Sequence, residues 1–148
     1  MPDSVVVDAS VFIKLIASES DSDQALTCIE KLIKERYQVL APDLLRYEVI
    51  AKTALWCKRD QKVALDLWND CIEGLSIRFF EPYDELVKSA LNIVASCTLE
   101  KAGHPSFYDA IYHAIAIENA CDFITADRRH HSKTKHLGHI SLLADYEI

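Results

Sequence analysis

Two apolar stretches, each followed by an aspartate, determine the expected fold. Residues 5–8 are Val-Val-Val-Asp, and residues 121–127 are Cys-Asp-Phe-Ile-Thr-Ala-Asp. Short β-branched or aromatic runs of this kind predict buried strands, so Asp8 and Asp127 are each expected at the end of a strand. Ligands of open α/β sheets bind at the carboxyl ends of the strands. The sequence therefore predicts a site at the place where these two aspartates lie.

The residues between and beyond these stretches alternate between short strands and longer helices. Further strands are expected at 37–41, 76–80 and 140–143. Apolar residues recur at helical spacing in five other segments, which are 25–33, 44–55, 63–72, 86–97 and 107–119. The helix that begins at Pro82 is expected to end near Gly103. This order predicts an α/β fold, a three-layer α/β/α sandwich with a short, mostly parallel central sheet.

The composition is that of one globular domain. The chain has 148 residues, half of them hydrophobic, so residues 1–148 are expected to form a single domain with its own core. No apolar run is long enough to span a bilayer, and the first residues lack a signal-type segment, which predicts a cytoplasmic protein. The five cysteines are odd in number and contain no Cys-x-x-Cys pair, which disfavours a disulfide framework or a zinc ribbon.

The charge balance argues against a nucleic-acid partner at first sight. The formal net charge is −7, and phosphate repels carboxylate. This objection weakens if several carboxylates converge on divalent cations, because the metal reverses the local sign. The basic residues are also uneven: Lys58, Arg59 and Lys62 form one cluster, and a second one near the C-terminus contains Arg128, Arg129, Lys133 and Lys135.

Two further carboxylates stand out, although each has an ordinary structural explanation. Glu48 falls on the apolar side of its expected helix, where it is either functional or paired with Lys52 at i+4. Asp109 lies in the first turn of a helix, where it complements the helix dipole. Asp8 and Asp127 could likewise be helix or turn caps. Together, however, the four acids could converge on one pocket of hard oxygen ligands, which suits Mg²⁺ or Mn²⁺.

Four pieces of the chain, in order, carry a family resemblance. They are Val5-Val-Val-Asp-Ala-Ser, Pro42-Asp-Leu-Leu-Arg-Tyr-Glu-Val, Tyr108-Asp-Ala-Ile-Tyr-His-Ala-Ile-Ala and Thr125-Ala-Asp. Each piece is weak alone, but the ordered set resembles the PIN-domain nucleases, and among them the compact VapC-type toxins, over nearly the whole chain.

The resemblance implies a metal-dependent endoribonuclease that hydrolyses RNA. It implies a catalytic and metal-binding quartet that holds Mg²⁺ or Mn²⁺, with two supporting polar residues: Asp8, Glu48, Asp109 and Asp127, supported by Ser10 and Thr125. It further implies a homodimer that is inhibited by a small antitoxin protein. One departure is that some relatives carry another acid after the last aspartate, where this chain has Arg128-Arg-His-His-Ser. Arg128 and Arg129 could contact phosphates that flank the cleaved bond, or lie in a solvated loop.

Three functions are alternatives to a metal-dependent endoribonuclease. The same fold could belong to a catalytically weak or silent protein that acts by binding RNA or protein, or to a housekeeping RNA-processing nuclease. A receiver-like phosphoryl-transfer domain also uses strand-end carboxylates and Mg²⁺, but no lysine follows a late strand at the required place.

Several conspicuous side chains are expected to be structural. The C-terminal histidines have neither a cysteine pair nor a His-Glu-x-x-His motif, so a polar loop is expected rather than a zinc site. His113 could act as a general base, but a buried, hydrogen-bonded imidazole is the expected role. Leu55, Trp56 and Trp68 lie on apolar helix faces, and we expect core packing for them, or dimer contacts for the two tryptophans.

Overall fold

A single parallel sheet forms the centre of the computed structural model, which describes residues 3–97 and 103–148. The five strands are arranged in the order β3-β2-β1-β4-β5, and every neighbouring pair is parallel. The strands are β1 (Ser4–Val7), β2 (Gln38–Pro42), β3 (Ser76–Phe80), β4 (Asp122–Thr125) and β5 (Ile140–Leu142).

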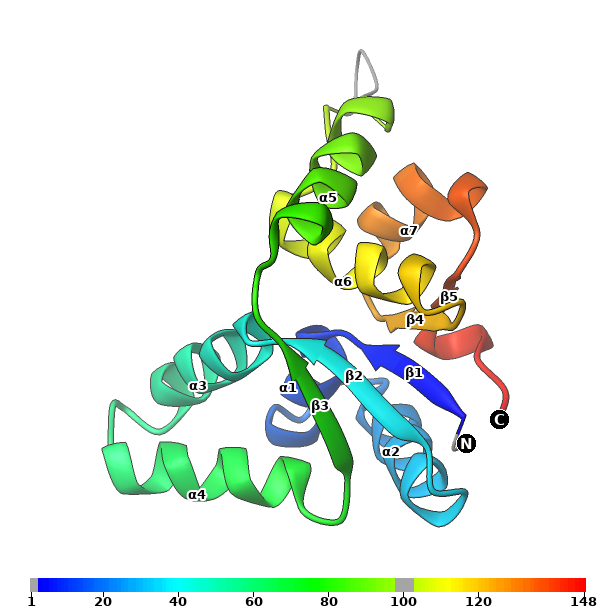
Figure 1. Ribbon diagram of the computed structural model, residues 1–148. Coiled ribbons are helices and arrows are strands. Elements are labelled where there is room, and N and C mark those ends of the chain that lie inside the picture. The colour runs from blue at the N-terminus through cyan, green and yellow to red at the C-terminus, as the bar shows by residue number, and fades with distance from the viewer. Residues whose placement is uncertain (1–2, 98–102) are drawn as a thin grey trace.

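Helices cover both faces of this sheet (Figure 1). On one face α6 contacts β1, β2 and β4, and α5 packs against α6; α1 and α2 lie on the opposite face. The expected three-layer α/β/α architecture is confirmed. The helices are α1 (Ala9–Ile16), α2 (Ser22–Lys34), α3 (Leu44–Trp56), α4 (Gln61–Ile72), α5 (Asp84–Ser96), α6 (Phe107–Glu118) and α7 (Arg128–Thr134), with short 3-10 turns at Lys135–Leu137 and Leu143–Asp145.

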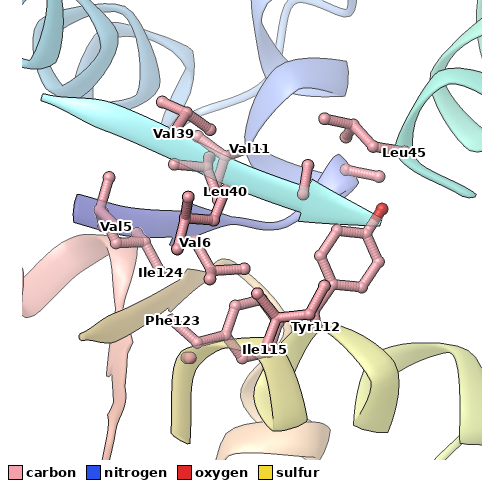
Figure 2. Close-up of a cluster of buried hydrophobic side chains, with 14 of the residues drawn as sticks. Val5, Val6, Val11, Val39, Leu40, Leu45, Tyr112, Ile115, Phe123 and Ile124 are labelled. Carbon is pink, nitrogen blue, oxygen red and sulfur yellow. The ribbon is translucent and has the colours of Figure 1, made fainter. Parts of the chain in front are cut away.

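The core is built around the central strand β1. Its three valines are completely buried, because a middle strand of a parallel sheet is covered on both faces, and this explains the continuous β-branched run. Phe123 of β4 stacks on Tyr112 of α6, with ring centroids 5.7 Å apart and ring planes 12° apart. Figure 2 shows these two aromatic side chains beside the aliphatic residues of β1, β2 and β4.

The pairing of β1 with β4 brings the two ends of the sequence together. Val7 lies opposite Ile124, and the backbone N–H of Asp8 donates to the carbonyl of Ile124 at 2.9 Å. β2 lies on the other side of β1, so the strand order reverses direction here. Such a switch point leaves a crevice at the carboxyl ends of the strands, where ligands bind in sheets of this type.

Some boundaries differ from the sequence expectations. The helix expected from Pro82 to about Gly103 is observed as α5, which begins after its N-cap residue Tyr83 and ends at Ser96; residues 98–102 lie outside the described part of the chain. Helix α1 was not expected. Its eight residues include buried and half-buried apolar side chains on most sides, so the sequence carries no clear helical stripe.

The outer helices gave two wrong expectations. The C-terminal histidines do not lie in a simple polar loop, because residues 128–134 form α7 and His130 is only 3% exposed. Leu55 was expected to pack in the core, yet it is 65% exposed because α3 extends away from the sheet. Trp56, expected in the core or at a dimer contact, is 61% exposed and so does not pack in the core, whereas Trp68 is buried. Within the described ranges, no helix is long and apolar enough to cross a membrane.

The aromatic stack predicts that the free energy of unfolding is especially sensitive to substitution of Phe123. Phe123→Ala should lower the free energy of unfolding by about 3–5 kcal/mol, because it removes a fully buried ring and leaves a cavity. Leu91→Ala, on the exposed side of α5, is the matched control and should change it by less than about 0.5 kcal/mol. Urea unfolding followed by circular dichroism measures both. Equal effects of the two substitutions would contradict this description of the core.

Candidate active site

Asp8 is the most buried carboxylate of the molecule's central crevice. It follows β1, is 4% exposed, and uses one oxygen, Oδ2, to accept two hydrogen bonds of 2.8 Å, from the Thr125 and Ser10 hydroxyls. Asp8 is the N-cap residue of α1, as the helix-cap explanation has it, but its side chain makes no capping hydrogen bond to that helix. The two hydroxyls fix the orientation of the carboxylate.

The same hydroxyls tie the two strand ends to each other. Ser10 Oγ accepts a hydrogen bond from the Ala126 backbone N–H at 3.1 Å, and Thr125 Oγ1 accepts one from the Asp127 N–H at 3.0 Å. Ser10 and Thr125 were expected beside the carboxylates, and the structure places both against Asp8. Each hydroxyl donates to the acid and accepts from the backbone after β4, which holds the segment leading to Asp127 in place.

Asp127 caps a helix, as its position suggested, but only one of its two carboxylate oxygens takes part. It is the N-cap of α7, and its Oδ1 accepts hydrogen bonds from the backbone N–H groups of Arg129 (2.9 Å) and His130 (3.0 Å). The capping explanation is therefore correct for Oδ1. Arg128 and Arg129 are exposed in the first turn of α7 rather than in a loop, beside this carboxylate.

Glu48 reaches the same region from α3. Its Oε1 accepts a hydrogen bond from the Tyr112 hydroxyl at 3.0 Å. The alternative ion pair with Lys52 does not occur among the salt bridges of the described residues. The pKa of Glu48 is raised to about 7, chiefly by burial and also by the nearby charge of Asp8, while the hydrogen bond from Tyr112 opposes the rise. The charge of Asp8, which follows β1, thus acts on a carboxyl group carried by α3.

Asp109, in the first turn of α6, has a pKa that responds to the charges of the other three carboxylates. Burial is the main reason that its pKa rises to about 7, and the negative charges of Asp8, Asp127 and Glu48 each contribute. The pKa of Asp8 is also raised, chiefly by burial, with Asp127 adding to the rise and the two hydroxyl hydrogen bonds opposing it. Residues from four separate segments thus repel one another across one crevice.

None of the four carboxylates forms a salt bridge among the described residues. The ion pairs in that part of the chain are those of Lys14 with Glu19 and Asp21. No three Asp, Glu, His or Cys side chains within the described ranges are already close enough to form a metal centre. The donor chemistry nevertheless fits a divalent cation, because the carboxylates whose charges act on one another here are the hard oxygen ligands that Mg²⁺ and Mn²⁺ prefer.

Two buried neighbours of the site occupy consecutive positions of α6. Tyr112 anchors Glu48, and the signal for it was its position one helical turn after Asp109. His113 is completely buried, its Nε2 donates to the Gly138 carbonyl at 2.8 Å, and burial lowers its pKa. It therefore supports the packing of α6, as expected, rather than facing a substrate as a general base.

This fold and this arrangement of acids define the class of protein. The family model described as the PIN domain matches residues 5–136, and the chain belongs to the PIN domain family. No curated protein matches the chain. The matched segment contains all four carboxylates and both hydroxyls.

Three solved structures share the fold at low sequence identity. PAE2754 from Pyrobaculum aerophilum is 21% identical, with a TM-score of 0.65 over 97% of this chain and 92% of that one. VapBC2 from Rickettsia felis, bound to a DNA fragment from its promoter, is 12% identical, with a TM-score of 0.67 over 94% and 96%. VapC20 from Mycobacterium tuberculosis, a sarcin-ricin loop cleaving toxin, is 15% identical, with a TM-score of 0.57 over 78% and 83%.

The mutual repulsion predicts an unusual pH dependence of stability. With a folded-state pKa of about 7 against about 4 in the unfolded chain, Glu48 and Asp109 retain protons on folding. Their stabilising contribution is present at low pH and is lost as the pH rises through about 7. In chelator, Asp109→Asn should therefore raise the free energy of unfolding at pH 8, by about 1 kcal/mol after discounting for partial exposure, and have little effect at pH 5.

The matched control is Glu30→Gln, which removes one charge from the exposed side of α2. Chemical denaturation of the three proteins at both pH values gives the comparison. A destabilisation by Asp109→Asn that is the same at pH 5 and pH 8 would show that this carboxylate does not experience the repulsion.

Proposed function

We propose that this PIN-domain chain is a Mg²⁺- or Mn²⁺-dependent endoribonuclease that hydrolyses RNA phosphodiesters at the crevice formed by Asp8, Glu48, Asp109 and Asp127. The observation that supports it is the convergence of four carboxylates from separate segments, with Asp8 buried and the other three half-buried, and none of them in a salt bridge among the described residues. Burying acids in this way costs stability, so a structural role alone does not account for the arrangement.

Each acid has a distinct task in this proposal. Asp8, whose Oδ2 is held by two hydroxyls, offers Oδ1 as a fixed ligand, and Asp109 and Asp127 face it as further ligands. Glu48, with a pKa near neutrality, can take a proton from water at Oε2 while Tyr112 holds Oε1. Bound Mg²⁺ or Mn²⁺ would lower the pKa of a water and balance the charge that develops on the phosphate oxygens.

The RNA backbone needs a cationic contact beside this acidic crevice. Arg128 and Arg129 are exposed at the start of α7, directly after Asp127. An open hollow next to them is lined by Asp109, Asp127, Arg129 and Lys133 among others. Guanidinium groups there can hold phosphates on either side of the cleaved bond and so position the strand without reading its sequence.

The biological setting is proposed from the structural likenesses. Two of the similar structures are a VapC toxin and a VapBC complex. We therefore favour the toxin of a toxin–antitoxin pair, present as a homodimer and controlled by a small antitoxin protein, over a housekeeping RNA-processing nuclease or a catalytically silent RNA- or protein-binding relative. Co-expression with its neighbouring reading frame would distinguish a toxin from a housekeeping enzyme through relief of growth arrest.

The activity itself is tested by incubating the protein with a panel of structured and single-stranded RNAs in Mg²⁺ or Mn²⁺. Wild type should cleave internally, whereas Asp8→Asn and Asp109→Asn should each lose at least about 100-fold in rate, because transition-state charge stabilisation of this kind is worth several kcal/mol. Glu30→Gln should cleave like wild type. Cleavage that persists in both Asn variants would mean that another site or a contaminant is responsible.

Metal binding has a readout that does not depend on catalysis. Mn²⁺ should raise the melting temperature of wild type at pH 8, because an ion that binds only the folded state stabilises it and here also balances the repelling acids. The rise should be largely absent in Asp109→Asn and preserved in Glu30→Gln. Differential scanning fluorimetry over a Mn²⁺ titration makes the measurement, and an equal rise in all three proteins would contradict the proposed ligand set.

A further inference from the structure

The hairpin formed by α3 and α4 ends in a surface that the proposed site does not use. We define the hairpin tip as residues 52–62, which contain the end of α3, the connection and the start of α4. In Figure 1 this connection lies at an extremity of the molecule, away from the sheet. Trp56, the last residue of α3, is 61% exposed. A largely exposed tryptophan is uncommon and indicates a contact surface.

The charge of the hairpin tip is opposite to that of the whole protein. Lys52, Lys58, Arg59 and Lys62 are all exposed, and Asp60 is the one acid among them, whereas the whole chain has a net charge of −7. The Asp60 carboxylate caps α4 by accepting from the Val63 N–H at 3.1 Å. None of the four cations forms a salt bridge with a described residue. The tip therefore presents free positive charge around an aromatic face.

The backbone at two of these cations has an unusual conformation. Lys58 and Arg59 have φ angles of +53° and +64°, the left-handed region that side-chain-bearing residues rarely adopt. The Arg59 N–H donates to the Ala54 carbonyl at 2.6 Å, which closes the end of α3. Glycine or asparagine would reverse the chain here with less strain. The sequence instead places two adjacent basic side chains at the turn.

Helix α3 connects the hairpin tip to the carboxylates. Glu48, Lys52 and Trp56 are spaced by four residues, so they form one row along the helix. Eight residues of helix span about 12 Å, the length of roughly three or four stacked nucleotides. An RNA strand with one phosphate at the crevice could therefore follow this row and reach the tryptophan.

A second copy of the chain is the competing occupant, since exposed Leu55 and Leu65 add apolar area to the hairpin. A two-fold symmetric contact centred on the hairpin tip would bring the cations of one tip against those of the other. A polyanion with stackable bases complements both the charge and the aromatic face. The charge of the tip thus favours RNA.

We propose that the hairpin tip binds single-stranded RNA, with a base stacked on Trp56 and backbone phosphates held by Lys52, Lys58 and Arg59. This inference deepens the proposed function and rests on it, because the strand so held leads along α3 to the carboxylates. The tip acts by positioning the substrate and contacts no reacting atom.

The test separates binding from cleavage by working in chelator. A short fluorescein-labelled single-stranded RNA is titrated with protein at several salt concentrations, and fluorescence anisotropy gives the affinity. Lys58→Gln/Arg59→Gln should weaken binding at least about 5-fold and reduce the slope of log affinity against log salt by about 1.4, which corresponds to two phosphate contacts. Lys31→Gln/Lys34→Gln removes the same charge from exposed positions of α2 and should leave the slope unchanged.

The stacking contact has its own readout. Trp56→Ala should weaken binding at least about 5-fold, and Trp56→Phe should restore most of it because a phenyl ring still stacks. RNA should also quench wild-type tryptophan fluorescence, and this quenching should disappear in Trp56→Phe, in which the buried Trp68 is the remaining tryptophan.

Three results would overturn the proposal. They are wild-type affinity in the hairpin variants, equal losses in the α2 control, and a Trp56→Ala protein whose mass in solution falls by half while its RNA affinity is unchanged. The last result would assign the surface to a second copy. RNA binding that depends on the tip without metal-dependent cleavage would instead refute the proposed nuclease and leave the tip as an RNA-binding surface.

Discussion

The organisation of the crevice depends on one buried carboxylate and the two hydroxyls that hold it. A carboxylate at 4% exposure is costly to bury unless hydrogen bonds replace the lost water, and Thr125 and Ser10 supply them to Asp8. The same hydroxyls accept backbone N–H groups after β4. The side chain of Asp8 is therefore coupled, through these hydroxyls, to the pairing of β1 with β4. It is coupled in the same way to the position of Asp127 and to the start of α7.

The placement of two other acids costs stability. Glu48 and Asp109 are partly buried beside like charges, and neither gains a basic partner among the described residues. A protein selected only for stability would place an apolar or neutral residue at such positions. The arrangement instead resembles other sites in which carboxylates are held apart from water until a cation or substrate arrives.

The sequence predicted the strands and the acidic crevice well, because buried parallel strands leave a strong apolar signal and their ends fix where Asp8 and Asp127 lie. It did not predict α7, whose polar residues are helical because Asp127 caps them and His130 packs on Phe123. It also left open whether Trp56 packs in the core or is exposed at a contact. Apolar spacing indicates a helix face but not whether a partner covers it, and α3 extends beyond the sheet that would have done so.

The long separation between partners in the crevice has a consequence for synthesis of the chain. The hydrogen bond between Asp8 and Thr125 joins residues 117 positions apart, and Asp127 comes later still. A nascent polypeptide on the ribosome therefore cannot complete the crevice until nearly all of the chain has emerged. Truncated translation products that lack the last quarter contain β1 without its partner β4, so they lack this crevice altogether.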